Sequence, residues 1–213
     1  MNVRSVESLS PEERRALFDR DAGVDAVRDD AREILDRVHT EGDVALRSFA
    51  EEFDGVTVGN IDVTDHAERA FDAIDDEVRT AIEEAAANVR SFHERQLPED
   101  WLEDVGGGRE LGRRFSPVES AGVYAPGGTA AYPSSVLMGV LPAKVAGVDH
   151  VAVATPPATD LPEATLAAAH VAGADAVYQV GGAQAIGALA YGTETISPVD
   201  KVVGPGNKYV TAA

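Results

Sequence analysis

From residue 115 onward, short Val- and Ala-rich runs alternate with small-residue segments that have helical spacing. The apolar runs are nearly continuous, unlike strands that keep one face in water. Strands of this type, separated by helices, are typical of a parallel sheet with helices on both faces. Because crossovers between parallel strands are right-handed, we predict an α/β fold with a Rossmann-like sheet.

This half of the chain is therefore predicted as a Rossmann-like domain over residues 115–213. Its elements follow one another in strict alternation, and each strand is separated from the next by one helix. Strands are expected at 120–125, 149–155, 174–180 and 199–203, and helices at 134–147, 162–173, 182–192 and from 206 to the last residue.

Residues 1–114 are predicted as an N-terminal helical region. Ser10, Pro11 and Glu13 form a capping-box pattern, with Pro at the first helical position. Apolar residues recur with helical spacing further on, and Gly42, Gly55 and Pro98 follow the expected helix ends. These further helices are expected over 24–41, 44–54 and 76–97.

The segment WLEDVGGGRELGRR, residues 101–114, is predicted as a short hairpin with a Gly-rich turn. Three consecutive glycines could instead cradle a phosphate group. A phosphate loop normally leads into a helix, and no helical pattern follows these glycines directly. A plain turn is the favoured interpretation.

Composition excludes several classes of chemistry. The chain has no cysteine, which removes disulfides, thiolate metal ligands and a cysteine nucleophile, and fits a reducing cytoplasm. The first residues, MNVRSVESLSPEERR, lack the apolar core of a secretory signal. No apolar run approaches membrane-spanning length, so we expect a cytoplasmic protein without membrane contact.

The net charge of -19 is concentrated in residues 1–114, which hold 30 of the 37 acidic residues. Such a surface repels nucleic acid and anionic lipid, so no nucleic-acid partner is expected. A solvated acidic surface, as in proteins from salt-loving organisms, is the favoured explanation, and an acidic interaction patch is the alternative.

Three loops leave the predicted carboxyl ends of the strands, where parallel sheets bind ligands. Each loop contains Gly-Gly or Gly-Pro-Gly and one polar residue suited to contact a nucleotide. Tyr124 offers a ring face and a hydroxyl, while Gln184 and Asn207 offer amides that donate and accept hydrogen bonds. The second and third loops run into helix N-termini, which favour phosphate.

A structural role is the alternative for each of these loops, since small residues also let helices pack closely against strands. Three such loops on one edge together favour a ligand site. Neither a G-x-G-x-x-G motif nor a P-loop is present, so the sequence motif of a conventional dinucleotide-binding site is missing. The histidines are scattered and form no metal-binding pair: His39, His66, His93, His150 and His170.

Three long segments resemble the histidinol dehydrogenase family: GVYAPGGTAAYPSSVLMGVLPAKVAGV, VGGAQAIGALAYGTETI and VDKVVGPGNKYVTAA. The resemblance implies a zinc-dependent oxidation of L-histidinol to L-histidine, the last step of histidine biosynthesis. It also implies that two NAD molecules are reduced in succession, that an aldehyde intermediate stays bound, and that the enzyme is a homodimer. The helical half resembles the family more loosely, as at TEGDVALRSFAEEFDGV.

By this resemblance, the family's NAD contacts fall on Tyr124, Gln184 and Asn207, with Pro126 nearby. Family members are about twice as long, and their catalytic Glu-His pair and their Gln, His, Asp and His zinc ligands lie in the other half. We therefore expect a fragment without a catalytic or metal-binding residue of its own, inactive by itself. The alternatives are a dehydrogenase of another small alcohol, such as a sulfonated diol, and a non-catalytic module for nucleotide binding or dimerisation.

Overall fold

The computed structural model describes residues 5–18, 23–127 and 130–213. At its centre, four parallel strands pair in the order β5-β4-β3-β6. The chain first adds strands on one side of β3 and then returns to its other side. The strands are β3 (Ser120–Tyr124), β4 (His150–Thr155), β5 (Ala176–Gln179) and β6 (Lys201–Val203).

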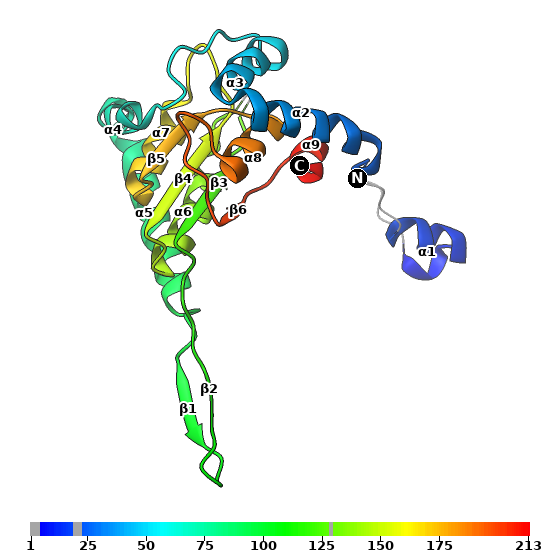
Figure 1. Cartoon of the computed structure of the whole chain (residues 1–213), viewed down its shortest axis with the longest axis vertical. Coiled ribbons are helices and arrows are strands. Elements are labelled where there is room, and N and C mark those ends of the chain that lie inside the picture. The colour runs from blue at the N-terminus through cyan, green and yellow to red at the C-terminus, as the bar shows by residue number, and fades with distance from the viewer. Residues whose placement is uncertain (1–4, 19–22, 128–129) are drawn as a thin grey trace.

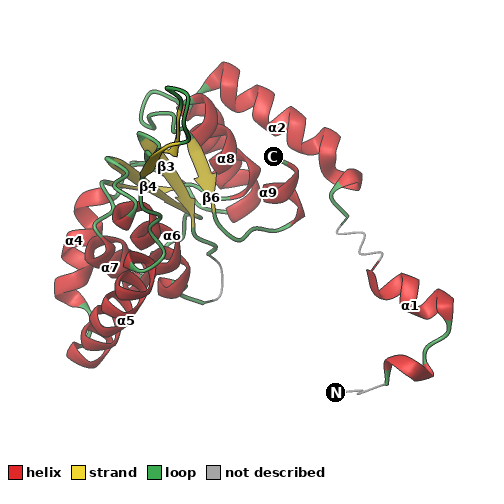
Figure 2. Ribbon diagram, turned by 90° about the horizontal axis from the view of Figure 1, so that it is seen from below, coloured by secondary structure: helices red, strands yellow, loops and turns green. Residues whose placement is uncertain are grey.

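Helices cover both faces of the sheet (Figure 2). The helices α6 (Pro133–Val145) and α7 (Glu163–Ala172) share one apolar core, while α8 (Gly182–Tyr191) belongs to the core on the opposite face. Crossovers between parallel strands are right-handed, so helices that lead to strands on opposite sides of β3 lie on opposite faces of the sheet. The helices α6 and α7 lead toward β4 and β5, whereas α8 leads back to β6. The predicted Rossmann-like α/β fold is confirmed, and the chain described here closes with α9 (Lys208–Ala212).

The N-terminal helices form an outer layer on each side. The α6–α7 side carries α4 (Thr64–Ala73) and α5 (Asp76–Glu94). The α8 side carries α2 (Arg28–Glu41) and α3 (Asp43–Phe49), which continues as a π-helical turn, η3 (Ala50–Asp54). Both apolar cores therefore combine residues from the two halves of the chain.

The first helix, α1 (Pro11–Phe18), begins with the predicted capping box. The backbone N–H of Glu13 donates to Ser10 Oγ at 3.1 Å, and the Ser10 N–H donates to the Glu13 carboxylate at 2.8 Å. Two short 3₁₀ turns, Val6–Ser8 and Asp25–Val27, flank this part of the chain. Within the described ranges, no helix combines the length and apolar character that crossing a membrane requires.

A two-stranded antiparallel hairpin projects from the amino-terminal edge of the sheet (Figure 1). Its strands are β1 (Trp101–Asp104) and β2 (Glu110–Arg113), and every residue in them is exposed. The glycines at 106–108 all have positive φ, a backbone conformation that suits glycine and forms the turn. The structure thus gives these glycines a conformational role.

A buried carboxylate joins the N-terminal helices to the segment after α8. Asp43, at the start of α3, is 6% exposed and accepts hydrogen bonds from the hydroxyls of Thr193 and Thr195. Burial would raise the pKa of Asp43, but these hydroxyls, the Thr195 N–H and Arg47 together lower it below its ordinary value. In return, the Asp43 N–H donates to the Glu194 carboxylate at 2.8 Å.

Replacing Asp43 by Asn should lower the free energy of unfolding by about 1.5–3 kcal/mol at neutral pH, because hydrogen bonds to an ionised group are lost. The native pKa is depressed, so the carboxylate stabilises the fold above its unfolded pKa of about 3.9, and that stabilisation disappears as pH falls through the native pKa. Urea unfolding at several pH values measures the difference between wild type and variant.

The matched control is Asp72→Asn, the same chemical change at an exposed carboxylate of α4. It should alter stability by less than about 0.5 kcal/mol at any pH tested. An Asp43→Asn variant as stable as this control at pH 7 would contradict the role assigned to the carboxylate.

Candidate functional site

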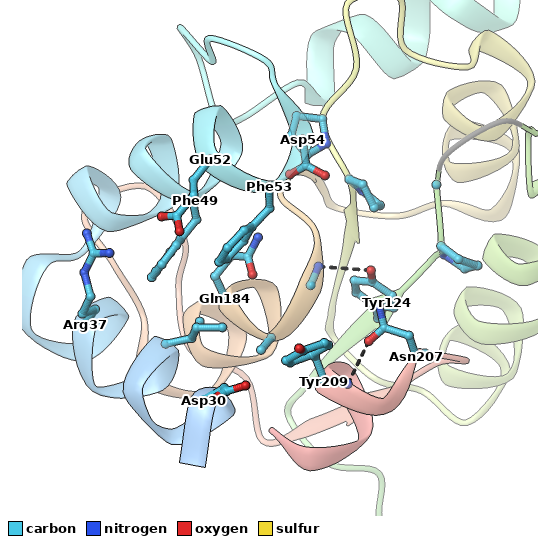
Figure 3. Close-up of a pocket in the computed structure, with 18 of the residues that line it drawn as sticks. Asp30, Arg37, Phe49, Glu52, Phe53, Asp54, Tyr124, Gln184, Asn207 and Tyr209 are labelled. Atoms are coloured by element: carbon cyan, nitrogen blue, oxygen red, sulfur yellow. Dashed lines mark hydrogen bonds between the residues drawn. The ribbon is translucent and has the colours of Figure 1, made fainter. Parts of the chain in front are cut away.

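A cavity of about 1110 Å³ opens at the carboxyl edge of the sheet. It lies where the strand order reverses, between the ends of β3 and β6, which is the usual ligand position in open parallel sheets. The strand-end loops and the N-terminal helices both line it (Figure 3). The three residues selected from the sequence, Tyr124, Gln184 and Asn207, all lie in its wall, as does Pro126.

Tyr124 is the last residue of β3 and is 5% exposed. Its hydroxyl oxygen accepts a hydrogen bond of 3.2 Å from the backbone N–H of Gly182, at the N-terminus of α8. Burial and then the negative charge of Asp54 raise the pKa of Tyr124, while the Gly182 N–H opposes the rise. The phenol is therefore neutral at physiological pH and links the end of β3 to the start of α8.

Gln184 lies in the first turn of α8 and is 3% exposed, although it is polar. Among the described residues its side-chain amide has no hydrogen-bond partner, and it faces the cavity. Gly182, with φ of +62°, leaves room for this amide, since a Cβ there would lie 2.4 Å from Gln184 Oε1. The amide is open to the cavity, so its donor and its acceptor are both available to a ligand there.

Asn207 has a structural role as well as a place in the cavity wall. Its Oδ1 accepts hydrogen bonds from the backbone N–H groups of Tyr209 (2.9 Å) and Val210 (3.1 Å), which caps α9. The oxygen is therefore occupied, and the amide NH₂ is the part of the side chain left for a ligand. From the sequence, both the donor and the acceptor of the Asn207 amide were expected to be available to a ligand.

The glycines of the three loops bring the loops against one another. Gly204, with φ of +142°, passes so close to β3 that a Cβ would lie 2.1 Å from the Tyr124 carbonyl oxygen. A Cβ at Gly181 would likewise meet Pro156 at 2.8 Å. From the sequence, the glycines were expected to let a ligand approach the loop backbone. Close packing between neighbouring loops is a second reason for glycine at these positions.

Sequence reasoning missed the opposite wall of the cavity, which comes from α2, α3 and η3. The rings of Phe49 and Phe53 stack with centroids 5.2 Å apart, and the Arg37 guanidinium lies 4.4 Å from the centre of the Phe49 ring. Phe53 is 52% exposed at the end of this column and faces the cavity. Its helical spacing resembles that of a core residue, so the pattern alone gives no sign of this position.

The described residues do not fit a zinc site, since they contain no group of three His, Cys, Asp or Glu side chains that could hold a metal ion. They do fit a ligand with polar and planar parts. The cavity offers the Gln184 amide, the positive end of the α8 dipole beside Ala183, and the exposed face of Phe53. These are the groups that contact nucleotides in many proteins.

Comparison with known proteins identifies relatives over nearly the whole chain. A family model described as histidinol dehydrogenase matches residues 19–213. The chain is 75% identical over 213 residues to a histidinol dehydrogenase of Haloarcula marismortui, covering all of this chain and 50% of that protein. A histidinol dehydrogenase of Geobacillus kaustophilus is 47% identical, with 99% of this chain and 47% of that protein covered.

The fold has a close counterpart among solved structures. The crystal structure of histidinol dehydrogenase from Elizabethkingia anophelis superposes with a TM-score of 0.83 at 36% identity, covering 87% of this chain and 44% of that chain. The chain spans about half the length of the curated relatives that it matches. From the family match over residues 19–213, the chain belongs to the histidinol dehydrogenase family.

Proposed function

We propose that this chain supplies the NAD-binding part of an enzyme that oxidises L-histidinol to L-histidine, with two NAD molecules reduced in succession. The observation that carries the proposal is the convergence of Tyr124, Gln184 and Asn207 on one cavity at the strand-order reversal. Family membership supports the substrate, because the relatives bear the name of that activity.

Three features of the cavity support NAD as its ligand. The N-terminus of α8, where Ala183 and Gln184 line the cavity, directs the positive end of a helix dipole toward the pyrophosphate. The Gln184 amide can both donate to and accept from the nucleotide, and the exposed Phe53 ring can stack on a planar base. When bound, NAD accepts the hydride that leaves the alcohol carbon.

We assign zinc binding and proton removal from the alcohol to residues outside this chain. The described residues provide no metal cluster, so zinc and the catalytic base are assigned to the half of the family sequence that the chain does not match. Removing a hydride from an alcohol needs a base and a group that stabilises the developing alkoxide. The working enzyme is further proposed to be a cytoplasmic homodimer.

Replacing Gln184 by Leu should weaken NAD binding by about fivefold to tenfold, because one hydrogen bond to a buried amide contributes roughly 1 kcal/mol. Gln184→Glu should weaken it more, since a carboxylate would face the pyrophosphate at the α8 N-terminus. Isothermal titration of NAD into wild type and variants measures both changes.

Gln96→Leu is the control for these variants, since Gln96 is exposed beyond the end of α5 and outside the cavity. It should leave the NAD affinity unchanged. Equal NAD affinity in wild type and both Gln184 variants would remove Gln184 from the proposed site, and a wild-type chain that binds no NAD would refute the proposed function.

The 213-residue chain alone should not oxidise histidinol, because its described residues include no group of side chains that could hold zinc. An assay with histidinol, NAD and zinc, followed by NADH absorbance, gives the rate. Turnover above the protein-free background would show that residues 1–213 hold a reaction centre, contrary to the proposal.

A further inference from the structure

The hairpin of β1 and β2 carries large apolar side chains into solvent on a projection from the sheet (Figure 1). Every residue of its two strands is exposed, and these residues include Trp101, Leu102 and Leu111. Phe115, just beyond β2, is exposed as well. A two-stranded hairpin that packs on nothing else is marginally stable in water. The exposed apolar side chains therefore indicate a surface that another molecule covers.

The strand register divides the hairpin into two unlike faces. Residues paired directly across an antiparallel ladder point to the same face, and neighbours along a strand point to opposite faces. The ladder thus places four side chains on one face, which we call the mixed face: Trp101, Glu103, Leu111 and Arg113. The strand residues of the opposite face include two carboxylates and no cation: Leu102, Asp104, Glu110 and Gly112.

The mixed face holds one charge of each sign beside its apolar side chains. Glu103 and Arg113 occupy diagonal positions in the ladder, and neither forms an ion pair with another described residue. The Arg113 guanidinium lies 5.5 Å from the centre of the Phe115 ring, which extends the apolar part of this face. Both charges are therefore available to a partner that offers the opposite charges in the opposite order.

The distribution of charge over the chain indicates which partner fits. Residues 101–115 hold three arginines and three acidic residues, so the hairpin is neutral and the net charge of -19 lies in the rest of the chain. Two copies that approach through their acidic surfaces repel each other, whereas two hairpins do not. In a contact with two-fold symmetry, Glu103 of each copy meets Arg113 of the other, so the mixed face is complementary to itself.

We propose that the mixed face of the hairpin packs against the same face of a second copy of this chain. The inference rests on the homodimer proposed above, for which it names the surface, and is independent of the NAD site. The hairpin leaves the amino-terminal edge of the sheet, and the cavity lies at the carboxyl edge. Dimerisation through the hairpin therefore leaves the cavity open.

The two-fold symmetry provides the test. Sedimentation velocity over a range of concentrations, at one salt concentration, gives the dimer dissociation constant of wild type, Glu103→Arg and Arg113→Glu. Each variant alone places like charges opposite each other twice and should weaken the dimer at least about tenfold. An equimolar mixture of the two variants places opposite charges together at both positions, so it should dimerise with an affinity within about threefold of wild type.

The leucines of the two faces provide a matched pair. Leu111 on the mixed face is 59% exposed, and Leu102 on the other face is 67% exposed. Leu111→Ser should weaken the dimer at least about tenfold, because apolar contact area is lost, whereas Leu102→Ser should change its affinity by less than about twofold. The emission of Trp101, the sole tryptophan, should shift to shorter wavelength as the wild-type dimer forms. Circular dichroism verifies that every variant is folded like wild type.

A wild type that stays monomeric at every concentration would overturn the proposal. So would equal effects of the two leucine variants, or a mixture of charge variants that dimerises no better than either one alone. Isothermal titration with NAD separates this proposal from the proposed function, because every hairpin variant should bind NAD as wild type does. Loss of the dimer with NAD binding intact in the mixed-face variants is the result expected.

Discussion

The reversal of strand order at β3 determines where everything else in the cavity lies. Because β4 and β5 extend the sheet to one side of β3, the return to β6 carries α8 across the opposite face. The same return brings the N-terminus of α8 to the end of β3, where the Gly182 N–H meets the Tyr124 hydroxyl. A parallel sheet without this reversal would leave no gap between neighbouring strand ends for a ligand.

The N-terminal helices form the wall of the cavity that faces the strand ends. Apolar contacts bury Ile34, Leu46 and Phe49 in the core beneath α8, and the Asp43 carboxylate ties the junction of α2 and α3 to the loop after α8. These contacts hold a wall of aromatic and acidic residues opposite the strand ends. One half of the cavity thus offers backbone N–H groups and amides, and the other half offers carboxylates and an aromatic ring.

The sheet half of the molecule could be predicted closely from the sequence, because strands buried on both faces leave a nearly continuous apolar pattern. Tyr124 and Gln184 could be chosen because strand ends of a parallel sheet share one edge. The position of Phe53 depends on packing between segments far apart in the chain, which periodicity does not encode. For the same reason periodicity does not reveal that Phe92, in α5, is 61% exposed, and no helix was predicted at 64–73, where the structure forms α4.

The hairpin of β1 and β2 also determines what optical spectroscopy can observe. Trp101 is the sole tryptophan of the chain, and it stands on this projection, at the edge of the sheet opposite the cavity. Its indole emission therefore responds to whatever surrounds the hairpin and is insensitive to occupancy of the cavity. Two of the five tyrosines, Tyr124 and Tyr209, line the cavity, so phenol absorbance is the intrinsic chromophore that senses its contents.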